Sequence, residues 1–277
     1  MKNLKIYAIT LIVFSISFVS CEKEAENKEV DQQLMKVSTT IDFTNELDFN
    51  SGIEVSSENS SYSNRITNQT NRFLPCASVS VNNTTPGVFP KVFTVDYGTG
   101  CTHNGITRSG IVTITVSNYV MANGSIMTIQ RGNNYYINGN KVEGTVVYTN
   151  TTTTPGTPQW TRTITNGKIT NLLGEVFNHN GTRSVKQIAG ANTLVFIDNI
   201  YEITSGTHTI SKVGGSSLTV TIASPLIKKY ACSNVSQGQL LLQGAVLNGI
   251  LDYGDNTCDN LATYTHSNGV VYNILLN

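Results

Sequence analysis

Four cysteines in the chain occur as two pairs of nearly equal spacing. Cys76 and Cys101 are separated by 24 residues, and Cys232 and Cys258 by 25. Each second cysteine follows an Asp-Tyr-Gly tripeptide, in the segments FTVDYGTGC and GILDYGDNTC. Four cysteines allow three pairings, and the repetition favours one disulfide within each copy. Zinc binding is disfavoured because the pairs contain no CxxC spacing.

The matching extends beyond the cysteines and defines an internal repeat of about residues 76–116 and 232–276. After the second cysteine, Ser109-Gly110-Ile111-Val112 opens an expected strand in the first copy, and Asn268-Gly269-Val270-Val271 opens one in the second. Each copy is therefore predicted to be a β unit closed by its own disulfide.

Oxygen-bearing side chains are concentrated in the second copy. Asp252, Asp255 and Asp259 lie within eight residues, and Ca²⁺ binds six to eight oxygen ligands that often come from such a loop. The first copy keeps only Asp96. The shared aspartate therefore favours turn chemistry, in which its carboxylate accepts backbone N–H bonds, with calcium as the alternative. No other metal or cofactor is expected.

Aromatic residues suggest a different ligand. Tyr135, Tyr136 and Trp160, the single tryptophan, could stack on sugar rings if they are exposed on a sheet. Adjacent tyrosines on a strand point to opposite faces, however, so one of the two would belong to the core. The four histidines fall in no HExxH or GxSxG context. No catalytic residue is identified, and an enzyme is not expected.

The elements that must position these residues are β-strands. Apolar residues alternate with threonine in several runs, among them Val92–Val95, Ile111–Val116 and Leu218–Ile222. Asn-Gly pairs, which favour two-residue hairpin turns, separate the runs, as at Asn138-Gly139, Asn166-Gly167 and Asn180-Gly181. The pattern predicts an all-β fold, an antiparallel meander of hairpins in the form of a sandwich, an open barrel or an elongated curved sheet.

Charge divides the chain into two parts. The 277 residues carry 18 basic and 18 acidic side chains, so nothing favours a nucleic-acid partner. Residues 22–71 have 10 acidic and 4 basic side chains, whereas residues 72–277 have 8 and 12. We interpret residues 72–277 as the β domain and residues 21–71 as an acidic, Ser/Asn-rich tether.

One segment of the tether has helical periodicity. Val30, Leu34, Val37 and Ile41 recur at helical spacing, although the β-branched residues that follow weaken the pattern. A short helix over about Asp31–Leu47 and an irregular tether are both compatible with it. Residues 51–71 are expected to be a flexible linker.

The N-terminus carries targeting information. Residues 1–20 have a basic start and an apolar run over Ile6–Val19, too short to span a bilayer and typical of a signal peptide. The run ends in Phe18-Val19-Ser20-Cys21, which resembles a bacterial lipobox with Cys21 as the lipidated residue. The following Glu22–Glu26 segment resembles the surface-export signal of Bacteroidota lipoproteins, and a solvated tether facing the periplasm is the alternative.

The C-terminal pattern of Asp252-Tyr253-Gly254, Cys258-Asp259-Asn260, Asn268-Gly269 and Tyr272 is similar to that of predicted outer-membrane lipoproteins of the Bacteroidota. The resemblance implies a location and a style of fold, and no catalytic residue. We therefore expect an outer-membrane lipoprotein, held in lipid through acylated Cys21 and displayed on the cell surface. It would act as a non-enzymatic binding or structural module with a glycan or protein partner. The alternative is a glycan-binding accessory of a polysaccharide-uptake system.

Overall fold

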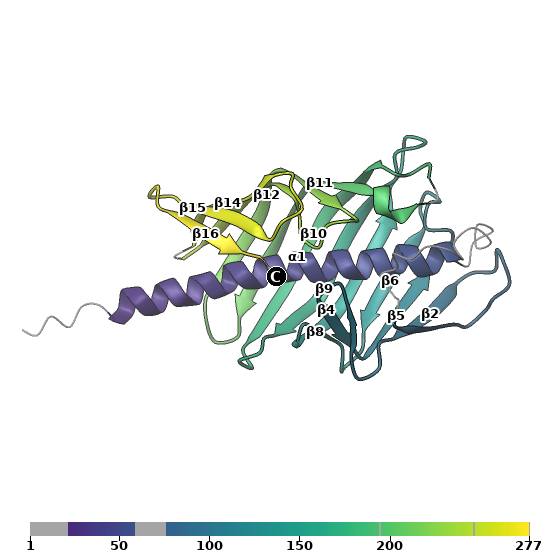
Figure 1. Cartoon of the computed structure of the whole chain (residues 1–277), viewed down its shortest axis with the longest axis horizontal. Helices are drawn as coiled ribbons and strands as arrows, with labels where there is room; N and C mark the ends of the chain where they lie inside the picture. The colour runs from purple at the N-terminus through teal and green to yellow at the C-terminus, as the bar shows by residue number, and fades with distance from the viewer. Residues whose placement is uncertain (1–21, 59–75, 194, 246, 277) are drawn as a thin grey trace, which may run out of the picture.

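A computed structural model describes residues 22–58, 76–193, 195–245 and 247–276. Within these ranges the chain forms one long α-helix and a single antiparallel sheet of sixteen strands (Figure 1). The predicted all-β antiparallel meander is thereby confirmed. The signal peptide at 1–20, Cys21 and the expected linker from residue 59 onward lie outside the described residues.

Thirteen strands form the main path of the sheet, and each pairs with the strand before it and the strand after it on that path. They are β1 (Ser78–Val81), β2 (Lys91–Asp96), β5 (Ile111–Val116), β6 (Ile126–Arg131), β8 (Asn140–Asn150), β9 (Gln159–Thr170), β10 (Val176–Ala189), β11 (Ile200–Lys212), β12 (Ser217–Lys229), β13 (Gln237–Gly244), β14 (Asn248–Asp255), β15 (Leu261–His266) and β16 (Val271–Leu275).

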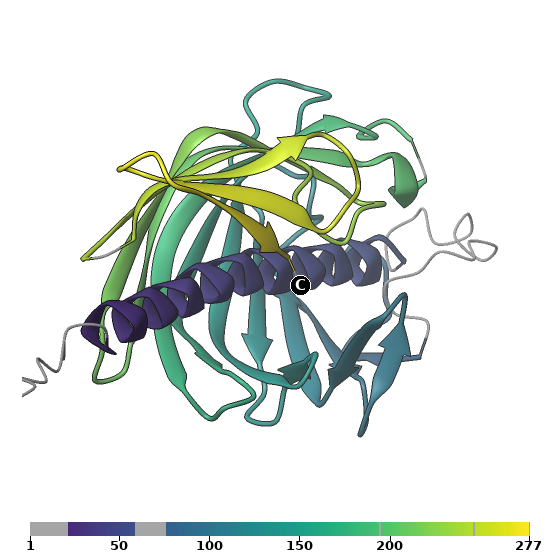
Figure 2. The same cartoon turned by 60° about the vertical axis from the view of Figure 1, so that its left-hand side comes forward.

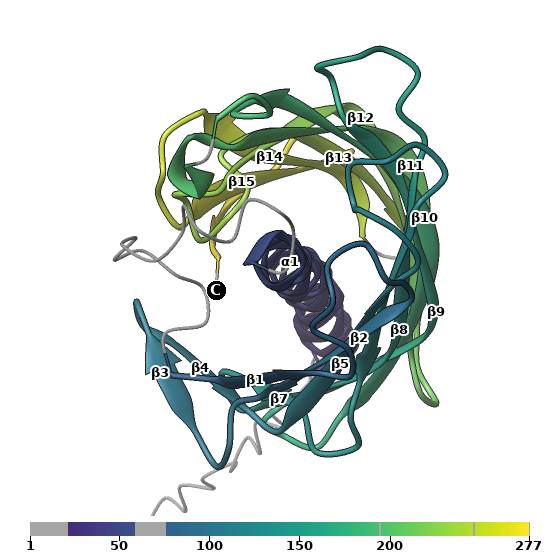
Figure 3. The same cartoon turned by 90° about the vertical axis from the view of Figure 1, so that its right-hand side faces the viewer.

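Three short strands lie beside this path. They are β3 (Cys101–His103), β4 (Ile106–Ser109) and β7 (Tyr136–Ile137), and they join the sheet through the pairing of β7 with β8. A short 3₁₀ turn, η2 (Phe196–Asp198), precedes β11. The edges of the main path are β1 and β16, and the sheet between them curls around the helix (Figure 3).

The strands form because one face of each is buried. In β5 the inward residues Val112, Ile114 and Val116 are buried, while the threonines between them point outward. This alternation is the pattern that a half-buried antiparallel strand requires.

Curvature comes from bulges within the long strands. The ladders shift register at successive positions from β8 to β14, and bulges increase the local bend and twist of a strand. Gly206 and Gly238 sit at two of these shifts with positive φ, and a Cβ on either would lie 2.2 Å from a neighbouring carbonyl oxygen. Only glycine fits such close backbone contacts.

Two expected hairpin turns are part of this bulge system. Asn138-Gly139 forms a turn as predicted, between β7 and β8. Asn166-Gly167 and Asn180-Gly181 instead lie inside β9 and β10, where the backbone N–H of Asn166 donates to Oδ1 of Asn180 over 3.0 Å. The prediction was wrong at these two sites; at the first, the positive φ of Asn166 serves a bulge instead of a turn.

The helix α1 (Glu22–Glu58) is longer than expected and runs along the concave side of the sheet (Figures 1 and 2). From Leu34 to Val55, every side chain except that of Lys36 is buried. Residues 51–58, expected to be linker, belong to the helix. The interpretation of this whole segment as a tether is therefore wrong for residues 34–55, which are part of the core.

Aromatic packing fixes the helix against the sheet. The ring of Phe49 contacts those of Tyr148, Trp160 and Tyr201, with centroid separations of 4.7, 5.5 and 5.2 Å. Aromatic pairs at such separations contribute beyond their buried area. The core of the molecule therefore lies between α1 and the sheet.

Candidate functional site

The interior between α1 and the sheet is rich in buried charge. Four arginines point inward from four different strands, and α1 supplies the acidic side chains that meet them. The residues are Arg108 on β4, Arg131 on β6, Arg162 on β9 and Arg183 on β10, with Asp42, Glu46 and Asp48 on the helix. All seven side chains are almost fully buried.

Asp48 is the centre of the first group. Its Oδ1 accepts from Arg108 over 2.8 Å and from the hydroxyl of Tyr135 over 2.7 Å, and its Oδ2 accepts from Arg131 over 2.8 Å. Arg108 also donates to Ser51 of the helix over 2.9 Å. Each oxygen of a carboxylate can accept two bonds, so Asp48 is well satisfied in spite of its burial.

Asp42 and Glu46 form the second group, six and two residues before Asp48 on the helix. Asp42 pairs with Arg183 at 2.5 Å, and Glu46 pairs with Arg162 at 3.2 Å. Burial raises the pKa of Glu46 and outweighs the opposing effect of Arg162. The guanidinium of Arg183 also contacts Nδ1 of His208 at 2.9 Å.

One tyrosine from each repeat copy contacts the helix. The hydroxyl of Tyr97 lies 3.4 Å from that of Ser51, and the hydroxyl of Tyr253 lies 3.4 Å from Oδ2 of Asp42. Both tyrosines are buried. Burial raises the pKa of Tyr97 to about 12, although Arg108, 4.1 Å above its ring, acts in the opposite direction. The two Asp-Tyr-Gly motifs therefore hold α1 from opposite margins of the sheet.

The aspartates of the motif form local turns. Oδ1 of Asp96 accepts from the N–H of Gly98 over 2.8 Å, and Oδ1 of Asp252 accepts from the N–H of Gly254 over the same distance. This is the turn chemistry predicted for the shared aspartate. The bonds are exposed rather than buried, so their loss costs less than that of buried donors.

The three carboxylates considered as calcium ligands do not converge on one point. Oδ1 of Asp255 accepts from Thr257 N–H, and Asp259 accepts from the Thr257 hydroxyl and from Leu261 N–H. Asp252 also accepts from Gln239 at 2.7 Å. Each carboxylate serves its own turn, and the described residues contain no group of three or more His, Cys, Asp or Glu side chains arranged to hold a metal ion.

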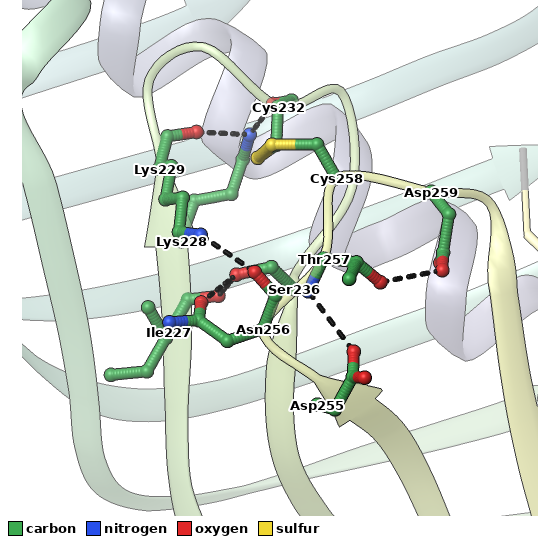
Figure 4. Close-up of a disulfide and its surroundings, with 10 residues drawn as sticks. All are labelled: Ile227, Lys228, Lys229, Cys232, Ser236, Asp255, Asn256, Thr257, Cys258 and Asp259. Atoms are coloured by element: carbon green, nitrogen blue, oxygen red, sulfur yellow. Dashed lines mark hydrogen bonds between the residues drawn. A yellow bond between two sulfur atoms is a disulfide. The ribbon is translucent and has the colours of Figure 1, made fainter.

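Both disulfides join the cysteines within a repeat copy, as predicted. Cys76 is bonded to Cys101 and Cys232 to Cys258, with Cα separations of 5.6 and 5.2 Å. Figure 4 shows the second bridge with Lys228, whose ammonium donates to the carbonyl oxygens of Lys229 and Cys232. Burial lowers the pKa of Lys228 to about 8, opposed by Glu46.

The two copies are not equivalent beyond their second cysteine. In the first copy, the strand after Gly110 is β5, which pairs directly with the motif-bearing strand β2. In the second copy, the strand after Gly269 is β16, which pairs with β15 instead. The matched sequences thus open strands in both copies, but these strands take different places in the sheet.

A cavity of about 170 Å³ lies where the two repeat copies approach each other. Leu47 of the helix, Tyr97 and Arg108 contribute to its wall. The remaining lining residues come from the β3–β4 hairpin, from η2 and from the segment after β12: Cys101, His103, Asn104, Ile106, Ile197, Tyr230, Ala231, Cys232 and Ser233. The walls combine apolar surface with neutral and basic hydrogen-bonding groups.

The aromatic residues suggested for sugar stacking are not gathered on a surface. Tyr135 and Trp160 are buried at 0% and 1% exposure, in contact with the helix. Tyr136 is half-buried on β7. Tyr135 and Trp160 therefore cannot form the predicted exposed platform, because their rings fill the core.

Two histidines are also internal. His179 and His208 are buried, and desolvation lowers the pKa of both, that of His179 to about 3. Neither ring nitrogen of His179 has a hydrogen-bond partner among the described residues. His103 lines the cavity instead, and His266 lies at the β15–β16 turn.

The sequence reasoning missed the inward arginines and their acidic partners. The sequence did indicate them, because acidic residues are in excess in residues 22–71 and basic residues are in excess in residues 72–277.

Comparison with protein-family models, curated proteins and solved structures finds no match. Within the described ranges, α1 lacks the apolar content that a membrane-crossing helix requires.

Proposed function

We propose that this protein is a lipid-anchored, non-enzymatic binding module of the outer membrane, displayed on the cell surface. Acylated Cys21 would be its attachment to lipid. The sequence support is the signal-peptide pattern with its lipobox and the similarity to Bacteroidota lipoproteins. The ligand site is the cavity between the two disulfide-closed repeat units.

The observation that carries this proposal is the position of α1. The helix begins at Glu22, directly after the proposed lipidation site, and its Leu34–Val55 part is buried within the sheet. Leu47 of the same helix forms part of the cavity wall. The helix would therefore connect the anchor to the ligand site as one rigid element.

The chemistry of the cavity defines the ligand class. An engineered cavity of about 150 Å³ accommodates benzene, so about 170 Å³ suits a molecule of roughly one ring. Ile106 and Ile197 offer apolar contacts, while His103, Asn104 and Ser233 offer hydrogen bonds. We propose a small amphipathic ligand. Asp42, Glu46 and Asp48 are paired with buried arginines, which supports binding rather than acid–base catalysis by these carboxylates.

One experiment tests both parts of the proposal. Wild-type protein should incorporate labelled palmitate and fractionate with membranes, whereas Cys21→Ser should do neither. The soluble Cys21→Ser protein is then screened with phenols, indoles and monosaccharides for increases in melting temperature. A monosaccharide hit would favour the glycan-binding role, and an aromatic hit a different ligand.

A cavity-filling variant identifies the site. Ile106→Trp should abolish the increase in melting temperature for any hit, while Ile111→Trp, at an exposed position on β5, should preserve it. Equal increases in both variants would place the ligand elsewhere. A screen without hits would count against binding and favour a purely structural module.

A further inference from the structure

The turn between β9 and β10 exposes two adjacent leucines. Leu172 and Leu173 are 76% and 77% exposed, the highest values among the large apolar side chains described. Asn171 fixes the turn, because its Oδ1 accepts from Leu173 N–H over 3.0 Å and from Glu175 N–H over 2.9 Å. Gly174 supplies the positive φ. Neither leucine is needed for the turn geometry.

Other turns at the same end of the sheet expose apolar residues as well. Val213, between β11 and β12, is 61% exposed, and Val270, between β15 and β16, is 45% exposed. The strand registers bring these turns to one end, since Phe177 pairs with Lys212 and Gly249 with His266. Turns usually carry polar residues or glycine. The opposite end of the sheet also exposes apolar side chains, such as Met121 and Ile197, but none of them approaches the exposure of Leu172 and Leu173.

The β9–β10 and β11–β12 turns are linked to the helix. Glu175 pairs with Lys212 at 2.7 Å, and the Lys212 ammonium donates to Oε1 of Gln33 over 3.3 Å. This bond to Lys212 is the main reason why the pKa of Glu175 is lowered. Leu172 and Leu173 therefore hold a fixed position relative to α1.

The N-terminal part of α1 projects beyond the sheet at this end (Figures 1 and 2). The helix begins 11 residues before Gln33, so at about 1.5 Å per residue its start lies roughly 16 Å further along the axis. Cys21 directly precedes that start.

We infer that the turns carrying Leu172, Leu173, Val213 and Val270 rest on the lipid leaflet that holds the acyl chains of Cys21. The inference depends on the proposed lipidation. Because the helix start lies beyond the turns, contact requires α1 to be inclined to the membrane plane, with the β9–β10 turn on the lower side. The leucines would then enter the interface, where burial of apolar side chains is favourable.

Quenching by brominated lipid tests this contact in the full acylated protein. Leu172→Trp and, at the opposite end of β10, Ile188→Trp each add one exposed tryptophan to a background in which Trp160 is buried. The proteins are reconstituted into phosphatidylethanolamine–phosphatidylglycerol vesicles with or without brominated acyl chains. We expect a blue shift and a loss of emission for Leu172→Trp, with Ile188→Trp resembling the parent.

Flotation separates failure of the contact from failure of the anchor. If all proteins float with the vesicles but Leu172→Trp is quenched no more than Ile188→Trp, the contact is wrong and the anchor stands. If the parent protein does not float, the lipidation and the contact fall together. The soluble double variant Cys21→Ser/Leu172→Trp tests whether a second copy of the protein, rather than lipid, covers these turns. If its introduced indole is shielded from iodide and the protein elutes as a dimer, the turns bind a second copy, which also overturns the inference.

Discussion

At the scale of single residues, buried charge is the unusual feature of this molecule. Asp48 joins two strands to the helix through Arg108 and Arg131, both buried. Burying a carboxylate is costly unless it is paired and hydrogen-bonded. The network therefore specifies where the helix lies along the sheet, since a shift of one residue along α1 would separate each acid from its arginine.

Asp48→Asn should destabilise the protein strongly. The substitution keeps the shape of the side chain but leaves two buried guanidinium groups without their counter-charge, at a cost of about 3 to 5 kcal/mol. Chemical denaturation, followed by the emission of Trp160, measures the loss. Asp198→Asn, at an exposed position in η2, is the matched control and should change stability little. A small effect of Asp48→Asn would mean that water or other donors replace the ion pairs.

His179 should make stability dependent on pH. Its pKa is lowered to about 3 in the folded protein, whereas an unfolded histidine titrates near 6.5. Between these values the unfolded chain binds a proton that the folded chain does not. The free energy of unfolding should therefore fall by about 1.4 kcal/mol per pH unit below pH 6.5 from this residue alone.

The pH slope can be assigned by substitution. Unfolding free energies measured at pH 7, 6, 5 and 4 should decline less steeply for His179→Gln than for the wild type. Asn178→Gln, at an exposed position beside it on β10 with no titratable side chain, should leave the slope unchanged. Identical slopes in all three proteins would exclude His179 as the source.

At the scale of elements, the sequence predicted the strands better than the helix. Alternation of apolar and threonine residues located strands such as β5, and the repeat gave the disulfide pairing. The helix was underestimated because its buried face is polar as well as apolar, with Asp42 and Asp48 among the core residues. A helix buried on all sides has no single apolar stripe for periodicity to detect.

The same limit applies to the interior of the sheet. In β9, Trp160, Arg162 and Ile164 occupy alternating inward positions, and all three are buried. An arginine in such a series indicates an acidic partner across the core, which single-strand patterning cannot identify. The acidic 22–71 segment was the available candidate. Tertiary pairing, rather than local propensity, decided the position of this segment.

The two disulfides should stabilise the margins of the sheet to similar extents. Loops of about 25 residues give roughly 3.5 kcal/mol each in the chain-entropy account. The double variants Cys76→Ser/Cys101→Ser and Cys232→Ser/Cys258→Ser should each lose about this much in thermal or chemical unfolding. Non-reducing peptide mapping of the wild type provides the control, and any peptide that links Cys76 to Cys258 would contradict the pairing.

At the scale of the whole molecule, the sheet and the helix complete one another. The inner face of the sheet carries arginines from four strands, and the acidic partners that the structure shows for them all come from α1. The rings around Phe49 likewise come from the sheet. The open curved sheet is thus closed by a helix rather than by pairing of its edges.

A chain that lacks residues 22–58 should therefore fail to fold. Its sheet would bury arginines without counter-charges and would leave Trp160 and Tyr201 without the ring of Phe49. We expect no cooperative thermal transition and a tryptophan emission typical of exposed indole.

A synthetic peptide of residues 33–57 added in trans should restore the transition. The same peptide with Asp42→Asn, Glu46→Gln and Asp48→Asn should restore it poorly, because the apolar contacts remain but the charge pairing is lost. Cooperative melting of the truncated chain by itself would show that the sheet is a domain in its own right and that α1 merely docks against it.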